Sequence, residues 1–369
     1  EYNGIKFVND DGTEFTWEQD AEAERVLMSK LFKKASWDGV GRVYEDNANR
    51  IYIEGILEKI NVSAIADREF KVVIDCGNGA ATFTSPFILK ELNCKTFSIN
   101  CYPDGRFSAR QSEPVEENVW ELKEVVKSVK ADLGVAHDGD ADRLAVLDPK
   151  EGFIRQDSLI ALYAAMLLME RKGLVVVSID TGRVIDDVVE RYGGRVERYV
   201  LGKTHERVKE LGANNIVLAA EPWKLIDPRW GPWVDGVWQA GLLTKILIEE
   251  GKPLPQIMRD LGIKDYPWDR RSYLITPHNL RDQIYSDLVE SLYSLLGEPD
   301  NVITIDGYRF EYSDGSWILL RKSGTEPKIR LYSEAPDKER LKTMVDSIEK
   351  KLFSITKKYN GLIAEITYG

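Results

Sequence analysis

Three aspartates occupy every second position in the stretch AHDGDADRLAVLD, residues 136–148, and an arginine follows the third. Alternate residues of an extended loop point the same way, so Asp138, Asp140 and Asp142 can converge. Like charges this close repel one another unless a cation lies between them, and carboxylate oxygens are the ligands that a hard divalent ion prefers. Arg143 cannot bind a metal, but its guanidinium suits an anion such as phosphate. The stretch predicts one Mg²⁺ per chain, against the simpler interpretation of a solvated acidic turn.

A second stretch, RKSGTEPKIRLY at residues 321–332, has the side chains of an anion-binding turn. Glycine exposes backbone N–H groups, hydroxyls add further donors, and arginine adds a planar fork that matches a phosphate. The simpler interpretation is a hairpin with ordinary surface charge. We expect a phosphate-binding loop made by Arg321, Ser323, Gly324, Thr325 and Arg330.

Apolar strands alternate with amphipathic helices along the chain, and these elements must position the aspartate loop and the phosphate-binding loop. Residues 71–77 read as a buried strand, 119–131 as a helix, and 132–140 and 143–148 as further strands. This βαβ rhythm predicts a sheet covered by helices, and a similar pattern follows to about residue 251.

The pattern changes near the C-terminus. Residues 302–324 read as antiparallel strands with Asp-Gly turns, and 337–359 as a long amphipathic helix. We expect an α/β protein with tandem βαβ mixed-sheet domains around a cleft and a small α+β C-terminal domain, entered through a linker at 267–282. The predicted domains are 1–65 (a remnant of a first α/β domain), 66–155 with the metal loop, 156–268, and 269–369 with the phosphate loop.

Composition narrows the class of protein. The net charge is −11 with acidic and basic residues interspersed, which argues against a nucleic-acid partner, and no apolar run is long enough for a membrane span. Three well-spaced cysteines among 369 residues give no disulfide framework, so we expect free thiols in a reducing, cytoplasmic setting.

Four segments together resemble the α-D-phosphohexomutase superfamily: EYNGIK at the start, VVIDCGNGA, DGDADR and RKSGTEPKIRLYSEA. They occur in the same order as in that family, and the resemblance covers essentially the whole chain. The family has four domains around a cleft, and its first domain carries a phosphoserine loop resembling T-A-S-H-N-P. Since that loop shortly precedes a Y-N-G-x-K segment, the resemblance places the nucleophilic serine upstream of residue 1. It also implies that Lys6 is a general acid/base.

The resemblance implies a phosphosugar mutase. A phosphoserine transfers its phosphoryl group to a hexose phosphate, and the sugar bisphosphate intermediate turns and returns the other group, so that phosphate moves between C1 and C6. The aspartates would hold Mg²⁺ against the phosphoryl group that is transferred, and Arg143 would bind the same phosphoryl group. The phosphate loop would bind the other phosphate of the sugar, the resting phosphate, which does not react in that step. A sugar bisphosphate is the implied activator, and a monomer or homodimer the implied assembly.

One segment departs from the family. Its sugar-recognition loop resembles G-E-x-S-G-H, whereas this chain has AAEPWKLIDPRWGPWVDG at residues 219–236. Glu221 is retained and can accept hydrogen bonds from sugar hydroxyls, and Lys224 brings a charge where the family has none. Lys203, in a turn at 201–203, is a further candidate sugar contact. The departure leaves mannose, glucose, glucosamine and a pentose open as the sugar.

Two other functions compete with the mutase. The first is a phosphatase or a related phosphotransferase that uses the same metal loop, but its D-x-D-x-T nucleophile is not seen, because Ala141 and Arg143 flank Asp142. The second is a non-catalytic protein that binds a phosphosugar, which the altered sugar loop and the missing serine loop suggest.

Overall fold

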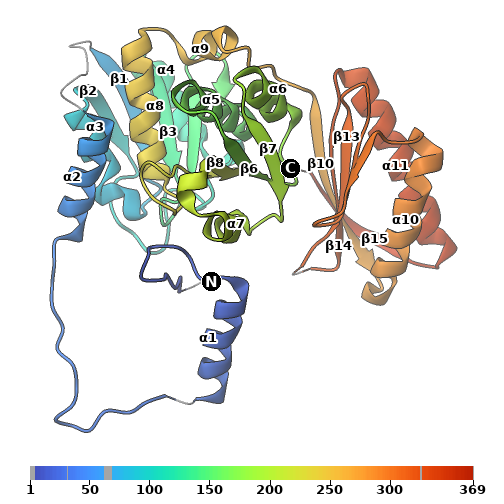
Figure 1. The fold of residues 1–369 in the computed structure, drawn as a ribbon, viewed down its shortest axis with the longest axis horizontal. Coiled ribbons are helices and arrows are strands. Elements are labelled where there is room, and N and C mark those ends of the chain that lie inside the picture. The colour runs from blue at the N-terminus through green and yellow to red at the C-terminus, as the bar shows by residue number, and fades with distance from the viewer. Residues whose placement is uncertain (1–4, 31, 62–68, 325, 369) are drawn as a thin grey trace.

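The computed structural model describes residues 5–30, 32–61, 69–324 and 326–368. These residues form two mixed sheets flanked by helices and a third, antiparallel sheet backed by helices on one face (Figure 1). The predicted fold class, tandem α/β domains followed by an α+β domain, is confirmed. Short 3-10 helices lie between the main elements, at Ala80–Phe83, Glu116–Asn118, Ala213–Asn215 and His278–Leu280.

The first sheet has the strand order β2-β1-β3-β4-β5. Its strands are β1 (Phe70–Asp75), β2 (Cys94–Ile99), β3 (Leu133–His137), β4 (Leu144–Asp148) and β5 (Gly152–Phe153). β1 pairs in parallel with β2 and β3, and β3 pairs antiparallel with β4. Helix α4 (Trp120–Val129) contacts β1 and β3, while α3 (Ser85–Glu91) contacts β1 and β2. The antiparallel step from β3 to β4 is short, and it creates the loop that carries the three aspartates.

The second sheet has the order β7-β6-β8-β9 and shares one core with the first. Its strands are β6 (Leu174–Ser178), β7 (Arg195–Tyr199), β8 (Ile216–Glu221) and β9 (Lys224–Ile226). The accompanying helices are α5 (Gln156–Glu170), α6 (Arg183–Arg191), α7 (Thr204–Leu211), α8 (Gly236–Glu250) and α9 (Leu254–Asp260). α5 and α8 are buried over most of their length, because each is apolar nearly all round and fills the space between the layers.

The third sheet has the order β11-β12-β13-β14-β10-β15. Its strands are β10 (Trp268–Thr276), β11 (Asn301–Ile303), β12 (Tyr308–Glu311), β13 (Trp317–Lys322), β14 (Lys328–Glu334) and β15 (Leu362–Tyr368). Helices α10 (Arg281–Leu296) and α11 (Lys338–Lys358) pack against one face of this sheet. The prediction of a linker at 267–282 is wrong, since β10 pairs with both β14 and β15. Its charged residues 269–271 conceal a strand that buries Tyr273 and Ile275.

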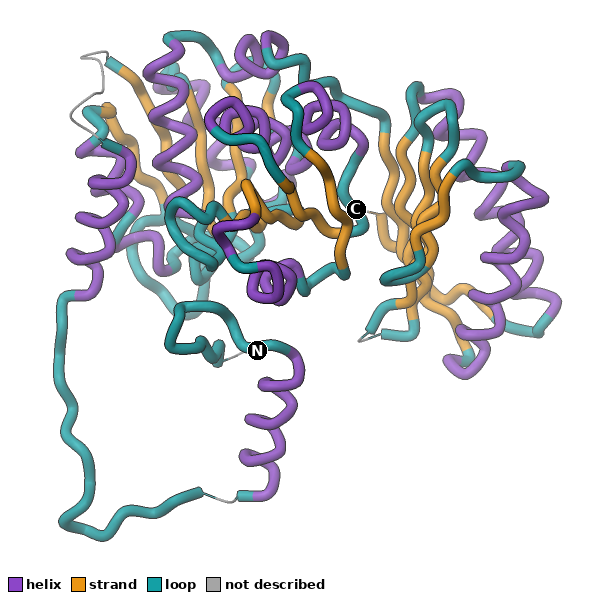
Figure 2. Tube along the Cα trace, viewed as in Figure 1, coloured by secondary structure: helices purple, strands orange, loops and turns teal. Residues whose placement is uncertain are grey.

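The N-terminal segment contains two helices, α1 (Trp17–Ser29) and α2 (Ala48–Ile60). α1 buries none of its residues, and residues 32–47 form an extended loop away from the sheets (Figure 2). α2 differs, because Ile56 and Ile60 enter the core that the first two sheets share.

Cys76 and Cys101 form a disulfide, so the prediction of free thiols is wrong for these two residues. The pairing follows from the fold: β1 and β2 are parallel neighbours, and the two cysteines follow the same ends of these strands, with Cα atoms 4.9 Å apart. Cys94 is a free, buried cysteine. Among the described residues, no helix combines the length and apolar character that a membrane crossing requires.

Candidate active site

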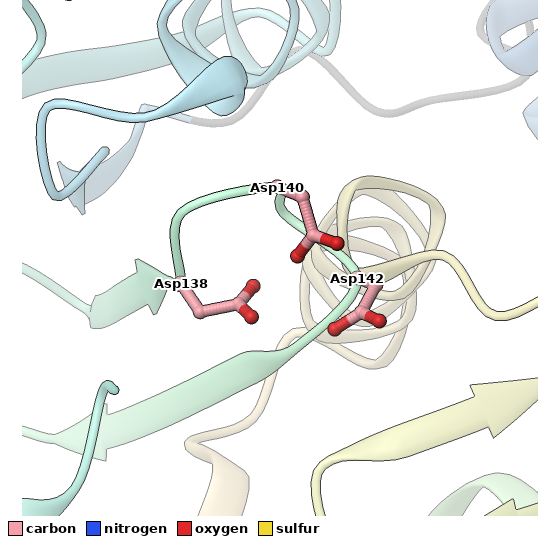
Figure 3. Close-up of side chains that lie close together, drawn as sticks. All are labelled: Asp138, Asp140 and Asp142. Atoms are coloured by element: carbon pink, nitrogen blue, oxygen red, sulfur yellow. The ribbon is translucent and has the colours of Figure 1, made fainter. Parts of the chain in front are cut away.

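The three aspartates converge on the loop between β3 and β4 (Figure 3). One carboxylate oxygen of each lies within 4.8 Å of the others. Asp138 and Asp142 are buried and Asp140 is exposed. Three oxygen donors at this spacing, open to solvent on one side, form a geometry that a divalent cation can bridge.

Backbone contacts hold this loop in place. The N–H of Gly139 donates to Ser112 Oγ at 3.0 Å, and the carbonyl of Gly139 accepts from the N–H of Ala80 at 2.9 Å. The N–H of Arg143 donates to Asp138 Oδ1 at 3.1 Å. Because two other parts of the chain and one bond within the loop fix its backbone, the carboxylates are positioned before any ligand binds.

A buried polar network lies beneath the loop, and sequence reasoning missed it. Arg110 donates to Asp75 Oδ2 at 2.8 Å, with both side chains at most 5% exposed, and also to the His137 carbonyl. The His137 ring lies between Ser85 Oγ, 2.9 Å away, and the Arg143 carbonyl, 3.0 Å away. Burial lowers the pKa of His137 to about 4, so its ring is neutral at physiological pH and serves as a support for the loop.

The electrostatics of the carboxylates favour a cation. Burial, together with the charges of Asp142 and Asp140, raises the pKa of Asp138 to about 7. Burial also acts to raise the pKa of Asp142, but Lys224 and Lys6 outweigh it and lower that pKa. The buried Oδ1 of Asp142 has no hydrogen-bond partner. Although Arg143 Nε lies 3.6 Å from it, a buried carboxylate oxygen without a hydrogen bond, in a cluster of three carboxylates, fits a divalent ion such as Mg²⁺.

Three basic side chains surround the carboxylates. Lys6 Nζ lies 2.7 Å from Asp140 Oδ2 and 2.7 Å from Asp142 Oδ2. Lys224 Nζ lies 3.1 Å from Asp142 Oδ2. Arg143 Nε lies 3.7 Å from Asp138 and 3.6 Å from Asp142, and its guanidinium also pairs with Glu113. The structure therefore brings the predicted Lys6 and Arg143 to the predicted metal ligands.

A cavity of about 500 Å³ opens beside the loop. Its lining combines residues of the loop, of the N-terminal segment before α1, of α2 and of the start of α8, including Lys6, Asp140, Asp142, Tyr52 and Asp235. Asp235 caps α8 by accepting from the N–H of Trp238, and it also accepts from the Tyr52 hydroxyl.

The candidate sugar residues lie near one another in the fold, but their side chains make different contacts. Glu221 is buried, and its Oε1 accepts from the N–H groups of Gly202 and Thr204 and from Thr204 Oγ1. That oxygen thus fixes the start of α7. Lys203 Nζ lies 3.4 Å from Glu206 and 4.4 Å from the centre of the Trp17 ring, so the Lys203 side chain contacts α7 and α1. Lys224, by contrast, contacts Asp142 of the metal loop.

The phosphate loop is the hairpin between β13 and β14. Arg321 Nε donates to Asp306 at 2.6 Å, and Arg330 donates to Ser323 Oγ at 3.3 Å. Gly324 is exposed and Thr325 lies outside the described residues. Sequence reasoning missed Arg281, which donates to the carbonyls of Ser323 and Glu326 and so holds both sides of the hairpin.

Arginines gather on the face of the third sheet opposite its helices. Arg321 pairs in register with Arg330, and Arg270 with Tyr332, whose ring lies 4.9 Å from the Arg270 guanidinium. Arg330 Nε and the Tyr332 hydroxyl are buried without hydrogen-bond partners. Unpartnered donors beside three arginines suit an anion, and Arg270 was not among the predicted residues.

Comparison with known proteins decides the family. Models of phosphoglucomutase/phosphomannomutase match in chain order: alpha/beta/alpha domain II at residues 50–152, alpha/beta/alpha domain III at 155–263 and the C-terminal domain at 280–351. A phosphopentomutase of Thermococcus kodakarensis is 41% identical over 340 residues, which are 92% of this chain and 73% of that protein. The chain belongs to the phosphoglucomutase/phosphomannomutase family.

Solved structures of family members share the fold. A phosphoglucomutase/phosphomannomutase family protein of Burkholderia thailandensis matches with a TM-score of 0.80 at 24% identity, over 94% of this chain and 72% of that one. An N-acetylphosphoglucosamine mutase of Aspergillus fumigatus, solved in complex with GlcNAc-6P and magnesium, matches with a TM-score of 0.58 at 14% identity, over 86% of this chain and 68% of that one. The family resemblance noted from the sequence motifs is confirmed.

Proposed function

We propose that this protein is a phosphosugar mutase that moves a phosphoryl group between C1 and the terminal carbon of a sugar phosphate, through an enzyme phosphoserine and a sugar bisphosphate intermediate. One observation carries the proposal: three carboxylates converge within 4.8 Å, and Lys6 lies 2.7 Å from two of them. Carboxylates that can hold a metal, beside a lysine, suit phosphoryl transfer. In that reaction a metal neutralises the charge of the phosphate, and a basic side chain donates or accepts the proton.

Each side chain then has a distinct task. Asp138, Asp140 and Asp142 would hold Mg²⁺, which when bound supplies a Lewis acid for phosphoryl oxygens. Lys6 would give a proton to, or take one from, the sugar hydroxyl that exchanges phosphate, and Arg143 would face the phosphoryl oxygens. Magnesium in the solved structure of the Aspergillus relative supports the choice of metal.

The resting phosphate would bind on the third sheet. Arg321, Ser323, Gly324, Thr325 and Arg330 form the proposed clamp, with Arg281 holding the hairpin. Glu221 and Lys203 would contact the sugar. Because a bisphosphate carries an anionic phosphoryl group at each end, the intermediate can exchange its ends between the clamp and the metal loop, which is the requirement for a mutase.

The first candidate substrate is a hexose phosphate, with transfer between C1 and C6, as the family description suggests. The second is a pentose phosphate, and specific observations favour it. After Glu221 the sugar loop has Pro222, Trp223, Lys224 and Leu225, so the serine and histidine of the hexose pattern are absent. The relative that is 41% identical is a phosphopentomutase.

The test is a side-by-side assay of glucose, mannose, glucosamine and ribose phosphates with Mg²⁺ and a trace of the matching bisphosphate. Isomerisation of one sugar phosphate, lost in Asp140→Ala, supports the mutase and identifies the sugar. Tight binding of a sugar phosphate without isomerisation would favour a non-catalytic binding protein, and release of inorganic phosphate would favour a phosphatase.

A further inference from the structure

Lys224 reaches the metal loop from a constrained turn. Glu221 and Lys224 are paired residues of the β8–β9 hairpin, so Pro222 and Trp223 alone form its turn. Trp223 has φ of 78°, a left-handed conformation that is costly for a residue with a large side chain. Such a conformation persists only where the surroundings hold it.

Contacts with β5 of the first sheet and with the start of α5 hold this turn. The N–H of Trp223 donates to Gln156 Oε1 at 3.1 Å, and its ring packs against Phe153 with centroids 5.8 Å apart. These contacts fix the start of β9, and with it the direction in which the Lys224 side chain leaves the hairpin. The Lys224 side chain, which stands in the altered sugar loop, is thereby directed at the metal loop.

The ammonium of Lys224 shares one carboxylate oxygen with Lys6. Both Nζ atoms lie on Asp142 Oδ2, at 3.1 Å and 2.7 Å, and the Asp142 side chain is only 10% exposed. Charges interact strongly in such a partly desolvated site. A divalent ion held by the three carboxylates must therefore approach a carboxylate that already carries two ammonium groups.

We infer that Lys224 competes with the divalent cation for Asp142 and so sets the cation affinity of the metal loop. This inference rests on the metal loop of the proposed function and goes beyond it, because it assigns Lys224 to control of the metal and removes it from sugar recognition. Lys224 is then a positioning residue, and its replacement by an uncharged side chain tightens cation binding.

A purely structural role predicts the opposite sign. If Lys224 only fastened the β8–β9 hairpin to the metal loop, its removal would loosen the three ligands and weaken the binding of the cation. The direction of the change in affinity therefore separates control of the metal from simple fastening.

The test is calorimetric titration of the full chain with MgCl2 alone, without substrate. Lys224→Met should bind Mg²⁺ about tenfold more tightly, as expected when one nearby positive charge is removed, and Lys224→Arg should stay near the unmodified affinity. The matched control is Lys252→Met, which removes the same charge from a lysine paired with Asp260 outside the proposed site and should change the affinity less than twofold. Unchanged or weaker binding in Lys224→Met overturns the inference.

A second measurement needs no substitution. Acetylation of lysines in the unmodified protein, followed by peptide mass spectrometry, should label Lys224 several-fold faster at saturating Mg²⁺, because the cation binds the carboxylate oxygen that Lys224 contacts. Lys252, which pairs with Asp260, should keep its rate. Equal or slower labelling of Lys224 overturns the inference. Neither readout requires turnover, so a failed mutase assay and a failed competition are separate results.

Discussion

Gly79→Ala tests whether the backbone beneath the metal loop sets cation binding. A Cβ added at Gly79 would lie 2.4 Å from the Gly139 carbonyl oxygen and 3.0 Å from that of Asp138, and both neighbours are backbone atoms. Ordinary contact begins at 3.4 Å, so the loop has to move by about 1 Å. Gly79 has φ of −98°, so the substitution adds no left-handed strain, and the close contact is its principal effect.

The expected cost follows from that displacement. Inserting a methyl group into a filled site costs about 1–3 kcal/mol of unfolding free energy. Metal ligands tolerate shifts of only about 0.2 Å, so a displacement five times larger should weaken Mg²⁺ binding by at least the ~10–100-fold seen for lost supporting contacts. Urea denaturation and calorimetric titration with MgCl2 measure the two effects.

Gly105→Ala is the matched control, because a Cβ there meets nothing within 4 Å. It should leave the Mg²⁺ affinity unchanged and the unfolding free energy within about 0.5 kcal/mol of the unmodified protein. The reasoning is refuted if Gly79→Ala binds Mg²⁺ as tightly as Gly105→Ala does.

Three further predictions address other parts of the molecule. Burial raises the pKa of Asp180 from 3.8 to about 6, so the contribution of Asp180 to the free energy of unfolding falls as pH rises from about 4 to 6. Asp180→Asn should reduce this dependence of stability on pH and add about 2–3 kcal/mol at pH 7. An unchanged pH dependence in urea denaturation contradicts this. Arg281→Met should raise the KM for the sugar phosphate roughly tenfold with a smaller change in kcat, because the phosphate loop loses its support; steady-state kinetics showing an unchanged KM would refute that role. Tyr52→Phe should cost about 1.5–3 kcal/mol in urea denaturation, since buried Asp235 loses a donor, and a loss under 0.5 kcal/mol would contradict it.

Local patterns accounted for the metal loop. The convergence of Asp138, Asp140 and Asp142 was predicted from their closeness within one short loop, but the loop is bent, with Ala141 at φ of 65°, and not extended as the alternation argument assumed. The hairpins of the C-terminal domain were equally predictable, because Asp-Gly turns and strand alternation are properties of neighbouring residues. The roles assigned to the site residues stay predictions, although Lys6 does lie on two of the three carboxylates.

Long-range contacts were not predictable from the pattern. Lys224 contacts Asp142 only because the β8–β9 hairpin packs against the first sheet. Arg110 is a single arginine in a loop, which the sequence suggests is exposed, yet it forms a buried ion pair with Asp75. The disulfide between Cys76 and Cys101 likewise depends on strand pairing. The linker prediction failed for a different reason: the charged residues of β10 obscured its buried alternation.

The most direct test of the proposed function is ³¹P nuclear magnetic resonance of the full-length protein with Mg²⁺ and catalytic sugar bisphosphate. The spectra would follow ribose 5-phosphate and glucose 6-phosphate in separate samples. The account predicts that a 1-phosphate resonance appears with at least one of the two sugars, and that Asp140→Ala abolishes it. Unchanged spectra for these two and for mannose and glucosamine 6-phosphates, with Mg²⁺ binding intact, would contradict the account.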